Sequence, residues 1–135
     1  MTRYVFDSYA VIAFFKGEPD ALRVERLLQS PSHDHFITTI NVGEVFYTEA
    51  KRTDLLTAEE MLEDLYKLPL QLVDATYDLV MQAAQIKARH KLSYADCFAA
   101  ALARKLDAIL VTGDQEFSQL EDIVAIEWLT TRRRS

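Results

Sequence analysis

The sequence predicts an α/β fold, a three-layer α/β/α sandwich around a mostly parallel sheet of about five strands. Short apolar runs rich in Val and Ile alternate with segments of helical periodicity, the pattern of a parallel sheet joined by helices. Several of these runs are nearly continuous, as expected for strands covered on both faces. The chain also has only three Gly and three Pro among its 135 residues, few for an all-β fold built on tight turns.

The expected elements follow one another in a regular order. Apolar runs predict strands at residues 3–6, 35–40, 70–73, 108–112 and 123–127. Helical periodicity predicts helices at residues 8–16, 20–29, 41–52, 57–67, 76–90, 93–106 and 115–120. Gly17 and Pro19 separate the first two helices, since Gly commonly ends helices and Pro begins them. Thr57 and Glu60 fit a capping box at the start of the fourth helix.

Length and composition indicate one globular domain over residues 1–135, ending in a flexible basic tail at 130–135. Half of the residues are hydrophobic, which argues against a disordered chain. The longest apolar run is too short to cross a bilayer, and a strand pattern begins at once, without a signal peptide. The single cysteine, Cys97, excludes an internal disulfide and a thiolate zinc cluster. We therefore expect a cytoplasmic protein that does not associate with membranes.

Net charge limits the classes of partner. The chain carries 21 acidic and 15 basic residues, a formal charge of −6. This balance disfavours a protein that holds nucleic acid by a broad basic surface. It is compatible with an enzyme that meets phosphates through metal ions, because clustered carboxylates would contribute much of the negative charge.

Four carboxylates occupy positions where ordinary surface charge is not expected. Asp7 and Asp114 each follow a predicted strand. Glu44 lies among the apolar residues of NVGEVFY, and Asp96 precedes a face of alanines in a predicted helix. In a parallel sheet the carboxyl ends of the strands and the N-termini of the helices after them share one edge, where α/β proteins bind ligands. Connectivity places three of the acids there, and Asp96 joins them if its helix packs antiparallel to the next strand.

Each acid also has an ordinary structural explanation. The segments NVGE (41–44) and SYAD (93–96) resemble capping boxes, and Asp7 and Asp114 could cap the helices that follow them. Convergence of all four favours function, because crowded carboxylates raise one another's pKa or bind cations, and no Lys or Arg lies within three residues of Asp96 or Asp114. Hard divalent ions prefer oxygen ligands. We therefore expect Asp7 to be a metal ligand on a rigid strand end.

Four segments resemble, in order and spacing, the PIN-domain ribonucleases, and most closely the VapC-type toxins of bacterial and archaeal toxin–antitoxin pairs. The resemblance extends from about residue 3 to residue 128, so the chain is expected to be one PIN-like domain. The segments are YVFDSYAVIAFF (4–15), TTINVGEVFY (38–47), LSYADCFAAALA (92–103) and AILVTGDQEF (108–117).

The resemblance implies an endoribonuclease that hydrolyses RNA phosphodiester bonds with Mg²⁺ or Mn²⁺ as cofactor. It assigns the acidic metal site to Asp7, Glu44, Asp96 and Asp114. Asp7 and Asp96 are expected to be direct ligands. Glu44 and Asp114 are expected to orient water or to complete the shell of a second ion.

The resemblance also implies accessory residues and protein partners. Ser8 and Thr112 match hydroxyl positions beside the first and last acids, and Asn41 is a candidate substrate contact or supporting residue. VapC-like toxins usually form homodimers and bind a small VapB-type antitoxin that covers the acidic site. Both partners, together with an RNA substrate, are expected here.

Other conspicuous residues have simpler explanations. Spacing gives structural roles to His33, His35 and His90, none of which forms an i, i+4 metal pair. The basic segment Lys87–Lys91 either faces RNA phosphates or is a solvated helix end. Helical spacing places Tyr9 and Tyr47 mostly in the core.

Two alternative functions remain open at the level of sequence. The chain could be a non-catalytic α/β interaction module whose acids are helix caps. It could also be a Mg²⁺-dependent phosphoryl-transfer domain, although haloacid-dehalogenase-like phosphatases need a second Asp where this chain has Tyr9. Metal-dependent cleavage of RNA would separate both from a nuclease.

Overall fold

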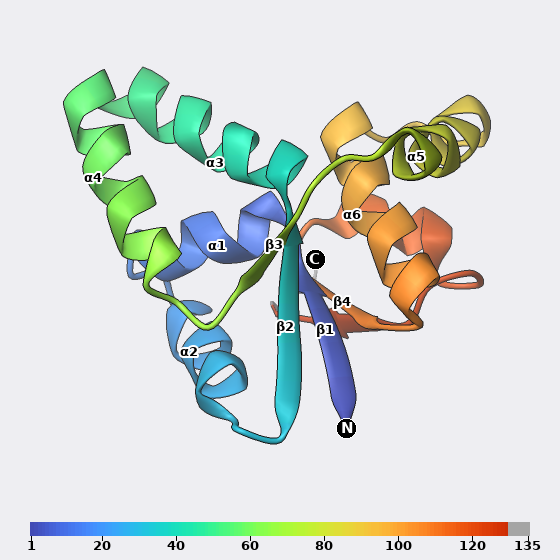
Figure 1. Ribbon diagram of the computed structural model, residues 1–135, viewed down its shortest axis with the longest axis horizontal. Coiled ribbons are helices and arrows are strands. Elements are labelled where there is room, and N and C mark those ends of the chain that lie inside the picture. Colours follow the sequence, from blue (N-terminus) through green and yellow to red (C-terminus); the bar gives the residue numbers. More distant parts are fainter. Residues whose placement is uncertain (130–135) are drawn as a thin grey trace.

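A computed structural model describes residues 1–129 and shows a five-stranded, all-parallel sheet in the order β3-β2-β1-β4-β5 (Figure 1). Each pair of neighbouring strands is parallel, which confirms the predicted three-layer α/β class. The tail expected at 130–135 lies outside the described residues. The strands are β1 (Thr2–Phe6), β2 (His33–Thr38), β3 (Gln71–Val73), β4 (Ile109–Thr112) and β5 (Ile126–Trp128).

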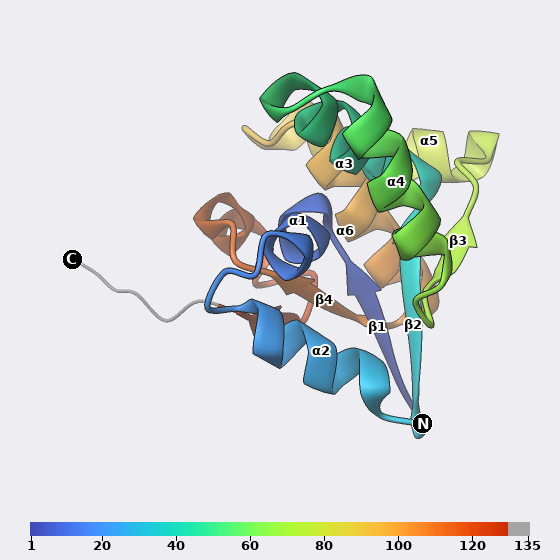
Figure 2. The same ribbon diagram turned by 90° about the vertical axis from the view of Figure 1, so that its left-hand side faces the viewer.

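Helices cover both faces of the sheet and form two separate cores (Figures 1 and 2). One face packs against α1 (Ser8–Phe15), α2 (Ala21–Gln29), α3 (Thr39–Arg52) and α4 (Leu55–Tyr66). The other packs against α5 (Tyr77–Arg89), α6 (Tyr94–Leu106) and the short 3₁₀-helix η1 (Gln115–Leu120). Alternation along β1 serves both cores, because Phe6 packs on the first side and Val5 on the second. No helix in the described part of the chain has the length and apolar character needed to cross a bilayer.

The central position of β1 brings distant parts of the chain to one edge of the sheet. β1 leads directly into α1, β2 into α3 and β4 into η1, so these helices begin at the carboxyl ends of their strands. α6 packs against β1, β2 and β4 and ends at Asp107, whose left-handed backbone (φ 53°) turns the chain into β4. The N-terminus of α6 therefore lies at the same edge as the other helix starts.

Two helices begin earlier than the sequence predicts, because other residues cap them. Thr38 ends β2 in an extended conformation and its hydroxyl accepts a hydrogen bond from Asn41 N at 3.0 Å, so α3 begins at residue 39 and not at 41. Asp54 Oδ1 accepts from Thr57 N at 2.7 Å and starts α4 at residue 55. The expected capping roles of Asn41 and Thr57 were therefore wrong. β2 also begins and ends two residues early, and β5 begins at 126 and not at 123.

Candidate active site

The structure brings the four predicted acids together at the carboxyl edge of the sheet. A pocket of about 370 Å³ is lined by Glu44 from α3, Asp96 from α6 and Asp114 from the end of β4. Asp7 lies beside this pocket at the end of β1, buried to 1% exposure. The charges of Asp96 and Asp114 act on its carboxyl group, which places all four acids in one electrostatic cluster.

Asp7 is held in place by two hydrogen bonds. Its Oδ1 accepts from Ala10 N at 2.8 Å, which caps α1, and its Oδ2 accepts from the hydroxyl of Thr112. Burial raises the pKa of Asp7 to about 8, against the lowering effect of these hydrogen bonds, and the two nearby acids add to the rise. Asp7 therefore serves as a helix cap and as a buried acid at once, so the two explanations offered by the sequence are compatible.

Asp96 sits in the first turn of α6, half-buried at the pocket wall. Its backbone amide donates to Ser93 Oγ at 3.1 Å, which is the cap that SYAD predicts. Burial raises the pKa of Asp96 to about 7, with further increases from Asp114, Glu44 and an additional acid, Glu116. No salt bridge found among residues 1–129 reaches the four predicted acids, so the clustered charge has no basic counterpart there.

A buried hydrogen-bond network positions Glu44. Ser8 Oγ donates to Glu44 Oε1 at 2.6 Å and accepts from Asn41 Nδ2 at 3.1 Å. The same Asn41 amide donates to Ala95 O at 3.2 Å, and the hydroxyl of Thr38 donates to Asn41 Oδ1 at 2.5 Å. Asn41 is 0% exposed, so of the two roles expected for it, only the supporting one is compatible with this geometry.

Thr112 connects the first acid of the sequence to the last. Its hydroxyl donates to Asp7 Oδ2 and accepts from Asp114 N at 3.0 Å. Asp114 Oδ1 in turn accepts from Glu116 N at 3.0 Å and caps η1. One buried hydroxyl thus fixes both the carboxylate at the end of β1 and the backbone that presents the carboxylate after β4.

Four residues of the pocket were not identified from the sequence as members of a site. Ser93 was seen only as a cap, and Tyr9 was assigned mostly to the core, yet both line the pocket together with Ile12 and Glu116. Tyr9 is 37% exposed. The sequence does indicate that two of these residues could belong to the site. Tyr9 and Glu116 each lie two residues after a predicted site acid, at the start of a helix.

The basic segment Lys87–Lys91 covers the end of α5 and the start of the loop that leads to α6. Lys87 is exposed, and its ammonium group donates to Leu92 O at 2.6 Å, next to Ser93. Lys91 instead contacts Gln119 through its backbone. No residue of this segment is among those that line the acidic pocket.

The side chains present fit a hard divalent cation by their chemistry. The four carboxylates and the hydroxyls beside them offer oxygen, the donor that Mg²⁺ and Mn²⁺ prefer. Burial raises the pKa of the Cys97 thiol to about 11, which disfavours a thiolate ligand beside Asp96. Within residues 1–129, no three His, Cys, Asp or Glu side chains already stand in the arrangement of an ion site. The cluster is therefore an open set of oxygen donors and not a preformed cage.

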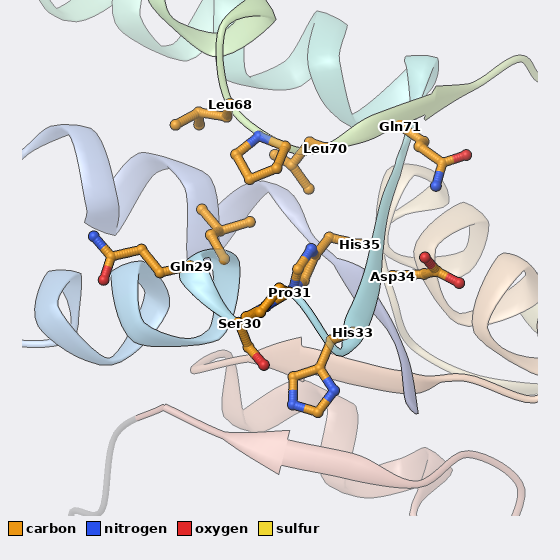
Figure 3. Close-up of a pocket in the computed structure, with 11 residues that line it drawn as sticks. Gln29, Ser30, Pro31, His33, Asp34, His35, Leu68, Leu70 and Gln71 are labelled. Carbon is orange, nitrogen blue, oxygen red and sulfur yellow. The ribbon is translucent and has the colours of Figure 1, made fainter. Parts of the chain in front are cut away.

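A second pocket, of about 550 Å³, lies at the opposite edge of the sheet, around the N-terminal end of β2 (Figure 3). His35 is buried there, with Nε2 2.6 Å from Leu27 O and its ring stacked near Tyr4. His33 meets the same Tyr4 edge-on, and its Nδ1 has no hydrogen-bond partner among the described residues. His35 thus has the structural role that the sequence suggests.

Comparisons with known proteins agree with this architecture. The DNA-bound VapBC structure from Salmonella typhimurium has a TM-score of 0.77 at 20% identity, covering 96% of this chain and 100% of that one. VapBC2 from Rickettsia felis, bound to a DNA fragment from its promoter, has a TM-score of 0.74 at 17% identity, covering 93% and 98%. VapC20 from Mycobacterium tuberculosis, described as a sarcin–ricin loop cleaving toxin, has a TM-score of 0.69 at 20% identity, covering 87% and 94%. No curated protein sequence matches the chain.

At these sequence identities the solved structures show only that the fold is shared. The family of the chain is shown by a match to a protein-family model. The model of the PIN domain matches residues 4–123, which include all four acids of the site. The chain therefore belongs to the PIN domain family.

Proposed function

We propose that this protein is a metal-dependent endoribonuclease and the toxin of a VapBC-type toxin–antitoxin pair. The observation that carries the proposal is the convergence of Asp7, Glu44, Asp96 and Asp114, from four separate segments of a PIN domain, on one edge of the sheet. A helix-capping role alone gives no reason for the four acids to share one edge. A divalent cation bound at that edge would offset the repulsion among their charges.

The roles of the residues follow from their contacts. Asp7 and Asp96, whose pKa values are raised most by burial, are proposed to hold Mg²⁺ or Mn²⁺. When bound, such an ion supplies a Lewis acid that polarises phosphoryl oxygens and makes water more acidic. Glu44, whose Oε1 accepts from Ser8, lines the pocket and is proposed to orient water or to bind a second ion. Asp114 also lines the pocket and is proposed to do the same.

The proposed biological role rests on the kinds of protein that share this fold. Several solved structures that match almost the whole chain are VapBC toxin–antitoxin complexes. An RNA substrate, a VapB-type antitoxin and a homodimer are proposed here on that basis. Apolar side chains available for such partners are exposed at the start and end of α4, where Leu55, Leu56 and Tyr66 are each more than half exposed.

The test of the enzyme is cleavage of RNA by the purified chain without antitoxin. Total RNA and defined ribosomal, transfer and messenger RNA substrates are incubated in EDTA, Mg²⁺ or Mn²⁺, and the products are mapped by primer extension. We expect cleavage only with a divalent ion. Asp96→Asn should reduce the rate by more than about 100-fold, beyond the 10- to 100-fold typical for residues that only support a metal ligand.

Asp54→Asn is the matched control, because it makes the same chemical change at the exposed cap of α4, a helix that contributes no residue to the pocket. It should cleave at the wild-type rate. Cleavage that persists in EDTA, or that survives in Asp96→Asn, contradicts the metal-dependent site. A chain that binds no ion and cleaves no RNA supports the interaction-module alternative. Light scattering then measures whether the free chain is a dimer.

A further inference from the structure

Tyr9 gives the acidic pocket an aromatic wall. It occupies the first turn of α1, lines the pocket with Glu44, Asp96 and Asp114, and is 37% exposed. Neither hydrophobic core of the protein includes it. Ile12 lies three residues further along the same helix face and lines the pocket as well. The pocket therefore combines charged walls with an apolar aromatic one.

The position of this ring is set by Gly113. A Cβ atom at residue 113 would lie 2.3 Å from Tyr9 Cε1, 2.7 Å from Cζ and 3.0 Å from the phenol oxygen. The far end of the ring thus lies directly over the backbone between Thr112 and Asp114, in space that any other residue at 113 would occupy. Gly113 itself has no positive φ, so its lack of a side chain serves the approach of Tyr9 and not an unusual backbone.

We propose that Tyr9 stacks on the base of a nucleotide beside the bond that is cleaved, an inference that rests on the proposed ribonuclease function. RNA presents two kinds of group to such a pocket, anionic phosphates and flat bases. The carboxylates and their cation account for the phosphate, but they offer nothing to a base. A partly exposed tyrosine held beside them offers the π-face on which proteins commonly stack unpaired bases.

The test compares two ligands that differ only by the base. Binding of adenosine 5′-monophosphate and of ribose 5-phosphate is measured by calorimetry in Mg²⁺, with no cleavable bond present. Wild type should bind the nucleotide about 5- to 150-fold more tightly, the range that stacking on an aromatic residue supports. Tyr9→Ala should bring this ratio close to one, and Tyr9→Phe should retain it, because phenylalanine keeps the aromatic face.

Gly113→Ala tests the role of the Tyr9 ring a second time, without replacing Tyr9 itself. The added methyl group must displace the ring, so the nucleotide preference should fall in the wild-type background. In the Tyr9→Ala background the methyl group has no ring to displace, and Gly113→Ala should leave the ratio unchanged. Circular dichroism and thermal melting confirm that each variant is folded.

Different experimental results would contradict base stacking on Tyr9 and the proposed ribonuclease function. Equal weakening of both ligands by Tyr9→Ala, or a wild-type ratio near one, overturns the stacking role even if RNA is cleaved. A ratio that depends on Tyr9 in a protein that cleaves no RNA supports stacking and contradicts the nuclease. Loss of the ratio in Tyr9→Phe as well as in Tyr9→Ala assigns the effect to the phenol oxygen and overturns stacking.

Discussion

Asn41 Nδ2 donates to Ser8 Oγ at 3.1 Å, so a fully buried amide on α3 fixes a hydroxyl at the start of α1. Ser8 passes this restraint to Glu44, which lies one turn beyond Asn41 on α3. The orientation of a pocket carboxylate thus depends on a residue that no substrate can reach in this structure.

Asn41 and Ser8 are expected to act as one unit. Asn41→Ala and Ser8→Ala should each lower the free energy of unfolding by about 1–3 kcal/mol, because each leaves buried polar groups without partners. The double variant should lose less than the sum of the two, since the contact between them can be lost only once. Urea denaturation in EDTA measures all four proteins. Strict additivity would show that the two side chains act independently.

Thr112 is expected to control metal affinity through Asp7. Thr112→Val keeps the shape of the side chain but removes the hydroxyl that donates to Asp7 and accepts from Asp114 N. Loss of this donor should raise the pKa of Asp7 further, because the Thr112 hydrogen bond lowers it. Calorimetric titration with Mn²⁺ should show about 10- to 100-fold weaker binding. Thr112→Ser restores the hydroxyl and should restore affinity; equal weakening by both variants contradicts the assignment.

Stability without metal should fall as pH rises. Burial raises the pKa of Asp7 from 3.8 to about 8 and that of Asp96 from 3.8 to about 7, so the folded chain binds more protons than the unfolded chain between these values. These two groups stabilise the fold fully below about pH 4 and lose that effect as pH rises through their folded pKa values.

Urea denaturation in EDTA from pH 5 to pH 9 measures this effect as the difference between wild type and the Asp7→Asn/Asp96→Asn double variant. Wild type should lose stability relative to the double variant as pH increases. A difference that is flat across this window, or that favours wild type at high pH, contradicts the raised pKa values.

Divalent cations should reverse the balance between wild type and Asp96→Asn. In EDTA at pH 8 the variant should melt higher, because one crowded charge is gone and Asn can still accept hydrogen bonds. Saturating Mn²⁺ should raise the wild-type melting temperature strongly, since an ion at 100 times its Kd stabilises by about 2.7 kcal/mol. The variant should respond little. A variant that melts lower in EDTA, with neither protein responding to Mn²⁺, would make Asp96 only a helix cap.

The shared edge of the four acids was predictable from the sequence, because connectivity places three of them there and the fourth depends on one helix orientation. Asp7 and Asp114 follow strands that must be parallel, and the acid on α6 needs only an antiparallel return of its helix, which the structure contains. The caps were harder to predict. Thr38 and Asn41 are both good N-cap residues three positions apart, and only the extended backbone at the end of β2 selects Thr38.

The solvent exposure of aromatic residues was also hard to predict from the sequence. The first helix reads SYAVIAFF, apolar on every side after Ser8, so periodicity cannot identify the face that points to solvent. Tyr9 lies outside the core because it is in the first turn of this helix, at the carboxyl edge of the sheet. Tyr47 is also half exposed, with Lys51 Nζ 5.6 Å above its ring, on a face of α3 that spacing alone had assigned to the core.

The order of the strands also determines when the acidic pocket can first exist. β1 is made first, yet it lies between β2 and β4, and the hydrogen bond from Thr112 to Asp7 spans 105 positions of sequence. Domains fold largely as units during synthesis at about 5–20 residues per second. A nascent chain that has not released β4 from the ribosome therefore has neither the hydroxyl that holds Asp7 nor Asp114. Translation products that end before β4 are therefore left without an assembled acidic pocket.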